Sequence, residues 1–195
     1  VTFCRAFDLN EIAIVNQQAI IGRDSSLNNA NAFFNCKQLY ARVTNLLNGE
    51  GASLKQLDFS MLDGSQFLNL DLISLHKVQN AYSHSVFKNV LNNNARSLFD
   101  GMIKILPEGQ KSNALLQAHS LLLSEDASSN NIPNLEIEAD DVKATHSATV
   151  SSFDEEQLFY LMSRGISNEE ARNMIVKGFL LDVINKLPSD YHEDF

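Results

Sequence analysis

The sequence predicts a mainly β protein, a β-solenoid followed by a small α-helical domain. Short apolar segments rich in Leu, Val, Ile and Phe alternate with turn-forming residues at intervals of about ten residues over most of the chain. Beyond Ser151 the spacing of the apolar residues changes to that of amphipathic helices. We therefore expect a β domain over residues 1–151 and a helical domain over residues 152–195.

The expected strands alternate apolar and polar residues, as a strand with one buried face does. Many short strands of this kind are typical of a sandwich, a barrel or a β-helix. The segments are QLYARVTNLL (38–47), SLKQLDFSML (53–62), QFLNLDLISLHKV (66–78), SLFDGMIKIL (97–106), LQAHSLLLS (116–124) and LEIEADDVKATHSATV (135–150).

Turn-forming residues, asparagine above all, separate these segments. Asn and Gly tolerate the left-handed backbone angles that the tight corners of a solenoid require, so they favour the β-solenoid over the other two architectures. The expected breaks are Asn28-Asn29, Gly49-Glu50-Gly51, Asp63-Gly64, Asn92-Asn93-Asn94, Asp100-Gly101, Glu108-Gly109 and an exposed loop at residues 127–131, which Pro133 follows.

Two helices are expected after Ser151. Asp154 with Gln157 forms a capping-box pattern, and Gly165 suits the end of the first helix. Ser167 with Glu170 repeats the capping box at the start of the second helix.

The apolar face of the second predicted helix is wider than packing against a single neighbouring element requires. Gly178 lies in its middle, where a glycine costs about 1 kcal/mol relative to alanine, and this suggests close packing there. Pro188 is expected to end the helix.

Composition excludes several classes of function. The net charge of -9 disfavours binding to a nucleic-acid backbone. No apolar run approaches the ~20 residues that span a bilayer. The two cysteines form no CxxC motif, and no P-loop, GxGxxG or GxSxG motif is present. The first residue is not Met and lies in a strand-like segment, so we expect the C-terminal part of a longer protein.

The stretch ADDVKATHSATV (139–150) holds the candidate site. If Asp140 and Asp141 lie on a strand, they point to opposite faces and cannot act as a carboxylate pair. His146 shares its face with Ala144 and Ala148, which leave room around an imidazole that could bind iron or zinc. One histidine does not complete a metal site, so the other ligands must come from another chain. The remaining strand histidines, which we expect to be structural or simply exposed, are His76, His84 and His119.

The segment NIPNLEIEADDVKATHSATVSSFDEEQLFYLMSRGISNEEARNMIVKGF (131–179) resembles the C-terminal part of the SufB/SufD family of iron–sulfur cluster assembly scaffolds. The family pattern contains P-x-L-E-I-x-A-D-D-V, a histidine-small-Ala-Thr step and D-E-x-x-L-F-Y-L-x-S-R-G-I. The upstream segment 83–124 is also similar to the family's strand region. The resemblance is firm from about Ala81 to Leu187 and looser before it.

Three positions make the chain most like SufD. A SufB cysteine implicated in holding the nascent cluster matches Ala118, and a SufB glutamate matches Ser147. The SufD histidine implicated in cluster assembly matches His146. The family usually has cysteine and glycine at the positions of Ala144 and Ser147, so this strand lacks a thiol ligand.

The resemblance implies a right-handed parallel β-helix with a C-terminal helical domain and a non-catalytic scaffold function. It implies a SufB-like partner on the β-helix and a SufC-like ATPase on the C-terminal helices. An iron–sulfur cluster would be held transiently at a site shared with the partner, with His146 as one ligand. No cofactor is expected to stay bound to the isolated chain, which could form a homodimer. The family works in the bacterial cytoplasm and in plastids.

The first predicted helix is the expected contact with the ATPase, through Leu158, Phe159, Tyr160 and Arg164. The alternative is that all four pack onto the end of the β-helix, since aromatic residues and arginine are common in both settings. Two other functions remain open: a β-helical carbohydrate-active enzyme, and a SufB-like structural homo-oligomer with no cluster role.

Overall fold

The computed structural model describes residues 1–8 and 11–184 of the 195. Its elements are β1 (Thr2–Asp8), β2 (Ile12–Ile21), β3 (Ser26–Phe34), β4 (Gln38–Leu47), β5 (Ser53–Leu62), β6 (Phe67–His76), β7 (Tyr82–Leu91), β8 (Arg96–Ile105), β9 (Asn113–Leu122), β10 (Ser128–Ile137), β11 (Lys143–Ser152), α1 (Glu155–Ser163) and α2 (Asn168–Ile184).

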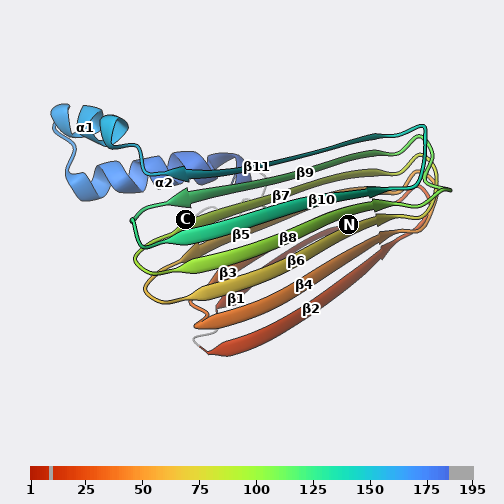
Figure 1. The fold of residues 1–195 in the computed structure, drawn as a ribbon, viewed down its shortest axis with the longest axis horizontal. Coiled ribbons are helices and arrows are strands. Elements are labelled where there is room, and N and C mark those ends of the chain that lie inside the picture. Colours follow the sequence, from red (N-terminus) through yellow and green to blue (C-terminus); the bar gives the residue numbers. More distant parts are fainter. Residues whose placement is uncertain (9–10, 185–195) are drawn as a thin grey trace.

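The strands form a parallel β-solenoid, as predicted (Figure 1). The odd-numbered strands make a six-stranded sheet in the order β1-β3-β5-β7-β9-β11, here called sheet A. The even-numbered strands make a five-stranded sheet in the order β10-β8-β6-β4-β2, here called sheet B. Successive strands therefore alternate between the two sheets, and each turn of the chain stacks on the turn before it.

The core lies between the two sheets, because alternate residues of every strand point inward. In β6, Leu68, Leu70 and Leu72 are each 0% exposed. The strands stack in register, so inward residues of successive turns form continuous columns. Phe87 of β7 and Phe99 of β8 meet across this interior as stacked rings, with centroids 4.8 Å apart. Burial of these columns supplies the main driving force for the fold.

The corners use asparagine and glycine, at the predicted breaks that contain Asn93, Gly51 and Gly64 and also at Asn35 and Asn80, which are not among the predicted breaks. Asn35, Asn80 and Asn93 have positive φ angles of 53°, 59° and 54°. Gly51 and Gly64 adopt φ angles of 73° and 61°. An amide side chain or a missing Cβ makes this region of backbone space accessible, which is why the solenoid turns at these residues.

Three predicted breaks are wrong, since they lie inside strands. Asn28-Asn29 belongs to β3, where Asn29 is buried and donates a hydrogen bond to Gln56. Asp100-Gly101 belongs to β8. The loop expected at residues 127–131 is mostly strand β10, which also contains Pro133. β10 is the edge strand of sheet B, and an edge strand accommodates proline because one side needs no hydrogen bond.

The segment 135–150 contains a corner instead of one continuous strand. β10 ends at Ile137 and β11 begins at Lys143. Asp140 and Asp141 occupy the bend between them. The backbone N–H of Asp141 donates to Oε1 of Gln110 at 2.9 Å, so this residue helps to hold the corner.

Both helices begin as their caps predict, and α1 also ends as predicted. Asp154 Oδ1 accepts from the backbone N–H groups of Glu156 and Gln157, at 3.0 and 3.1 Å. The Ser167 hydroxyl donates to Oε2 of Glu170 at 2.7 Å and accepts from its backbone N–H at 3.3 Å. Gly165 follows α1 with a φ of 88°. The predicted stop at Pro188 lies outside the described residues.

α2 lies on the outer face of sheet A (Figure 1). Val176 and Leu180 are buried there with Val90 of β7 and Leu121 of β9. The expected close packing at Gly178 is wrong, because this residue is exposed and a Cβ on it would meet nothing within 4 Å. β11 ends at Ser152 and α1 begins at Glu155, close to the boundary expected from the sequence. The division into two independent domains stays a prediction.

Candidate functional site at the end of the solenoid

β11 is the last strand of sheet A, and it pairs with β9 along one edge only. Ala144, His146 and Ala148 are in register with Ala114, Leu116 and Ala118 of β9. The β9 residues are buried inward residues. His146 therefore continues an interior column of the solenoid, at the turn where that column reaches the surface.

The imidazole of His146 is exposed at this end of the solenoid. It has no hydrogen-bond partner among the described residues. Its neighbours on the same face, Ala144 and Ala148, carry only methyl groups, whereas Thr145 and Ser147 point to the opposite face. The ring is thus accessible to a ligand that approaches along the solenoid axis.

The described residues do not complete a metal site around His146, because they contain no group of three or more His, Cys, Asp or Glu side chains placed to hold a metal ion. Ala118, which the resemblance to the family matches with a SufB cysteine, is 0% exposed in the neighbouring strand β9. Cys4 and Cys36 are far along the chain, in the first turns. A cluster held at His146 would need ligands from outside this part of the chain.

The other strand histidines have hydrogen-bond partners within the chain. His84 bonds to Oε1 of Gln117 at 3.0 Å, and His119 bonds to the Thr149 hydroxyl at 2.8 Å. His76 lies in the interior, 2.8 Å from the Ser83 hydroxyl. Burial lowers the pKa of His76 to about 4, so its ring is neutral at physiological pH.

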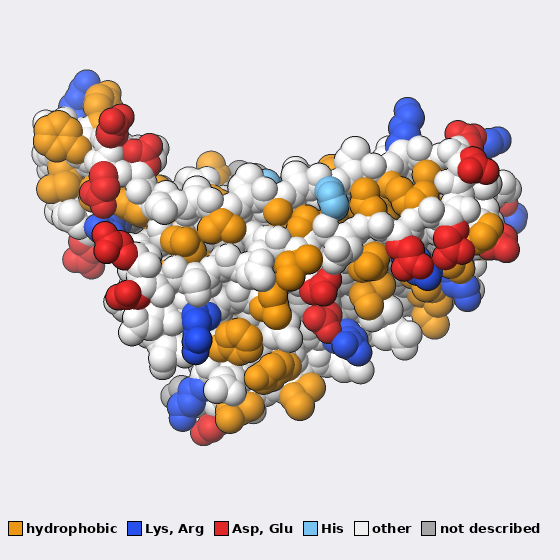
Figure 2. Space-filling view, viewed as in Figure 1, with side chains coloured by type: hydrophobic (Ala, Val, Ile, Leu, Met, Phe, Trp, Pro, Cys, Tyr) orange, Lys and Arg blue, Asp and Glu red, His pale blue; other side chains and the backbone are white. Residues whose placement is uncertain are grey.

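The helical end of the molecule carries a second exposed surface. Phe159 is 74% exposed and Tyr160 is 56% exposed, whereas Leu158 is 4% exposed. Cζ of Arg164 lies 4.9 Å from the centre of the Tyr160 ring. Figure 2 shows acidic and hydrophobic side chains gathered together at this end. Three of the four residues expected to contact a partner are therefore accessible, and Leu158 instead packs within this chain.

A hollow of about 480 Å³ lies on this helical surface. Its lining combines Phe159 and Tyr160 with the carboxylates Glu155 and Glu156. Both glutamates belong to the first turn of α1, where the positive end of the helix dipole stabilises them. The surface therefore offers aromatic contact area beside negative charge.

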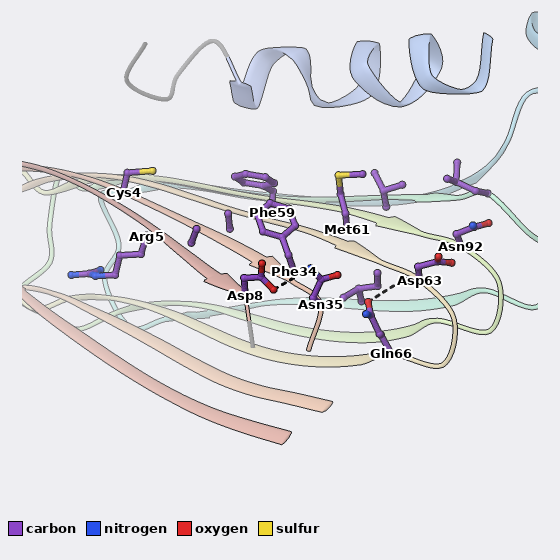
Figure 3. Close-up of a pocket in the computed structure, with 15 residues that line it drawn as sticks. Cys4, Arg5, Asp8, Phe34, Asn35, Phe59, Met61, Asp63, Gln66 and Asn92 are labelled. Atoms are coloured by element: carbon purple, nitrogen blue, oxygen red, sulfur yellow. Dashed lines mark hydrogen bonds between the residues drawn. The ribbon is translucent and has the colours of Figure 1, made fainter. Parts of the chain in front are cut away.

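A larger hollow of about 630 Å³ lies on the outer side of sheet A (Figure 3). Cys4, Phe59 and Met61 point into it from β1 and β5. Burial raises the pKa of the Cys4 thiol, which keeps the nucleophilic thiolate form scarce. None of the residues that line this hollow is a site residue predicted from the sequence.

Comparison with known proteins identifies the family. The family model for the SUF system FeS cluster assembly SufBD core domain matches residues 3–179. The chain belongs to the SufBD family. Iron–sulfur cluster assembly SufBD family proteins of Staphylococcus epidermidis, Staphylococcus haemolyticus and Staphylococcus aureus are each 34% identical to it over 146 residues. This match covers 75% of the chain and 31% of each relative.

The SufBD match confirms the family that the sequence resembles, and the solenoid confirms the expected fold class. Both the last strand β11 and the helix α1 fall within the matched residues. None of the helices formed by the described residues has the length and apolar character needed to cross a bilayer.

Proposed function

We propose that this chain is a SufD-like, non-catalytic scaffold subunit in the assembly of iron–sulfur clusters. Its relatives are described as iron–sulfur cluster assembly proteins. The observation that carries the proposal is the exposed His146 on the unpaired edge strand β11, between two alanines that leave its ring accessible. Imidazole nitrogen is a suitable ligand for iron, and a single imidazole needs a partner's ligands to complete a site.

The proposed partner on the solenoid is a SufB-like subunit. β11 and β10 are the end strands of sheets A and B, so each has one edge unpaired among the described strands. An unpaired edge offers backbone N–H and C=O groups to a strand from another chain. Such a partner would face His146 directly and could supply the remaining ligands. The cluster would be transient cargo held between the two chains.

The proposed partner on the helices is a SufC-like ATPase. Phe159, Tyr160 and Arg164 offer an exposed aromatic and cationic surface, and these residue types are enriched in interfaces. ATP hydrolysis in that partner would rearrange the two scaffold subunits and expose the cluster site. The net charge of -9 opposes nucleic-acid binding, and we place the complex in the bacterial cytoplasm or in a plastid.

The decisive experiment is reconstitution of the full-length protein with SufB-like and SufC-like subunits. We expect a three-protein complex with ATPase activity that transfers a cluster to an apo-acceptor protein. The variant His146→Ala should assemble this complex and lose most of the transfer. Thr145→Ala is the matched control, because Thr145 is the adjacent residue on the opposite face of β11 and should keep full transfer.

Three outcomes would overturn the proposal. Full cluster transfer by His146→Ala would remove the histidine from the site. A protein that binds neither partner, and instead forms homo-oligomers through the same end of the solenoid, would be a structural SufBD protein without a cluster role. Hydrolysis of a polysaccharide would favour the carbohydrate-active alternative.

A further inference from the structure

A group of polar side chains lies inside the solenoid, far from His146. Its members are buried and come from three strands that neighbour one another in the first turns. We call it the interior polar cluster, and it consists of Asn29 and Asn31 of β3, Asn45 of β4, and Gln56 and Asp58 of β5. Each of these five residues is at most 2% exposed.

The carboxylate of Asp58 fixes the direction of every amide around it. Its Oδ1 accepts from Nδ2 of Asn31 at 2.7 Å and from Nε2 of Gln56 at 2.8 Å. Because Gln56 turns its nitrogen toward the carboxylate, its oxygen accepts from Asn29 at 2.9 Å and from Asn45 at 3.2 Å. An ionised carboxylate can only accept, so these amide orientations follow from its charge.

The same orientations leave oxygen atoms without donors. Oδ2 of Asp58, Oδ1 of Asn31 and Oδ1 of Asn45 are buried and have no hydrogen-bond partner among the described residues. Oε1 of Gln17, on the neighbouring strand β2, is a fourth such atom. Buried acceptors are rarely left unsatisfied, because each costs the desolvation of its lone pairs. The excess consists of oxygens only, so the missing species is a cation or a hydrogen-bond donor.

Among the described residues, no cationic side chain pairs directly with the carboxylate of Asp58, whose side-chain partners are Asn31 and Gln56. On the strands around it, from β1 to β7, the other charged or titratable side chains that face the interior are Arg5 and His76. Nη1 of Arg5 donates to Oδ1 of Asn29 at 3.2 Å, and Figure 3 shows Arg5 pointing away from Cys4. His76 is held neutral beside Ser83. Burial also raises the pKa of Asp58 to about 7, the mark of an uncompensated carboxylate.

We propose that the interior polar cluster binds a monovalent metal cation, sodium or potassium, through the free oxygens of Asp58, Asn31 and Asn45, with Gln17 as a further ligand. Carboxylate and amide oxygens are the ligands that hard cations prefer. Asp58 supplies one negative charge, and the half-buried guanidinium of Arg5 already contacts Asn29 beside it. A singly charged ion therefore leaves a smaller net charge in the interior than a divalent ion would. The cation ties β3 to β5 and both to the opposite sheet. This site does not depend on the proposed function.

The cation should stabilise the fold, because it binds the native arrangement of oxygens and not the unfolded chain. The test measures the midpoint of thermal unfolding of the purified protein at pH 8, where Asp58 is ionised. Sodium chloride and potassium chloride are each titrated against choline chloride at constant ionic strength. We expect the midpoint to rise by about 3–6 °C at a cation concentration ten times the dissociation constant. Equal midpoints in all three salts would overturn the proposal.

Asp58→Asn removes the charge and adds an N–H donor in the same volume. The variant should unfold at the same temperature in all three salts. Asp71→Asn is the matched control, since Asp71 is an aspartate on the outer face of β6 that pairs with Arg42, and it should keep the full response. A cation response that survives in Asp58→Asn would contradict the site.

A direct measurement covers the case in which Asp58→Asn fails to fold. Crystals of the unaltered protein are soaked with thallous ion, which replaces potassium. An anomalous peak among the oxygens of Asp58, Asn31 and Asn45 supports the site. Water density without a peak, or a stability response to calcium that sodium and potassium do not give, shows that no monovalent cation is held there. The sodium and potassium arms decide between the two ions.

Discussion

Gly101 of β8 fills a place in the core that no larger residue can take without rearrangement. It is in register with Leu72 on one side and Pro133 on the other. A Cβ added to Gly101 would lie 2.7 Å from Cδ2 of Leu116 and 2.7 Å from both Cε1 and Cζ of Phe99. The change Gly101→Ala therefore inserts one methyl group against three atoms of two side chains.

Neither neighbour can move aside freely. Phe99 is 0% exposed and Leu116 is 1% exposed. The Phe99 ring is also stacked on Phe87 with 15° between the planes. Inserting a methylene into such a core lowers the free energy of unfolding by about 1–3 kcal/mol. Alanine has less conformational entropy than glycine in the unfolded chain, and this difference raises the free energy of unfolding by about 0.4–1 kcal/mol. We expect Gly101→Ala to lower the free energy of unfolding by about 1–2 kcal/mol.

The measurement is urea unfolding followed by circular dichroism, for Gly101→Ala in the natural background and in a Phe99→Leu background. Phe99→Leu removes the ring atoms that supply two of the three close contacts, so Gly101→Ala should cost less there. A stability equal to or above that of the unaltered protein would refute the packing described for Gly101. An equal loss in both backgrounds would show that Phe99 is not the obstacle.

Three further predictions concern the two helices and the buried titratable residues Asp58 and His76. Gly178→Ala should raise the free energy of unfolding by about 0.5–1 kcal/mol in the same urea assay, because α2 leaves open space at this exposed residue; a loss of stability would mean that Gly178 is packed after all. The raised pKa of Asp58, about 7, means that its contribution to stability is fully present below its unfolded pKa of about 4 and is lost as the pH rises through 7. His76, whose pKa is lowered to about 4, acts in the opposite direction, since its contribution is present above its unfolded pKa of about 6.5 and is lost as the pH falls through 4. The two effects offset each other in the natural protein. In choline buffers, the free energy of unfolding of Asp58→Asn should therefore rise with pH between pH 4 and 6.5, because only the His76 effect remains. A free energy of unfolding that does not change over this pH range would contradict the interior placement of His76. Finally, the double change Phe159→Ser and Tyr160→Ser should abolish binding to a SufC-like subunit in a pull-down with an unchanged unfolding temperature; retained binding would move that interface elsewhere.

The solenoid corners show what local chemistry can predict. Asn35, Asn80 and Asn93 turn the chain with positive φ, as their preference for this backbone region indicates. The strands β4 and β5 begin and end at the residues that the alternating pattern predicts. Asn29 shows the limit of the same rule, because it is a strand residue whose amide is satisfied inside the solenoid by Gln56. Partners more than twenty residues away decide between these two uses of asparagine.

For the candidate site too, the sequence indicates some features and only the structure shows the others. The resemblance of the sequence to the SufB/SufD family indicates His146, and its period-two neighbours predict the small residues beside it. Its exposure depends on where the stack of strands ends, which the pattern of β11 alone does not reveal. For the helix α1, the sequence indicates four contact residues, and the structure separates the buried Leu158 from the exposed Phe159 and Tyr160.

The interior polar cluster is the feature that only the tertiary structure reveals. In the sequence, Asn31, Asn45 and Asp58 lie on separate strands and read as polar positions of ordinary surface or turn character. Sequence by itself determined the repeat of strands and corners, the helix caps and the family, because these depend on neighbours within a few residues. Stacking of the turns decided which polar side chains meet inside, because the register between strands about thirty residues apart sets which face of each strand is buried.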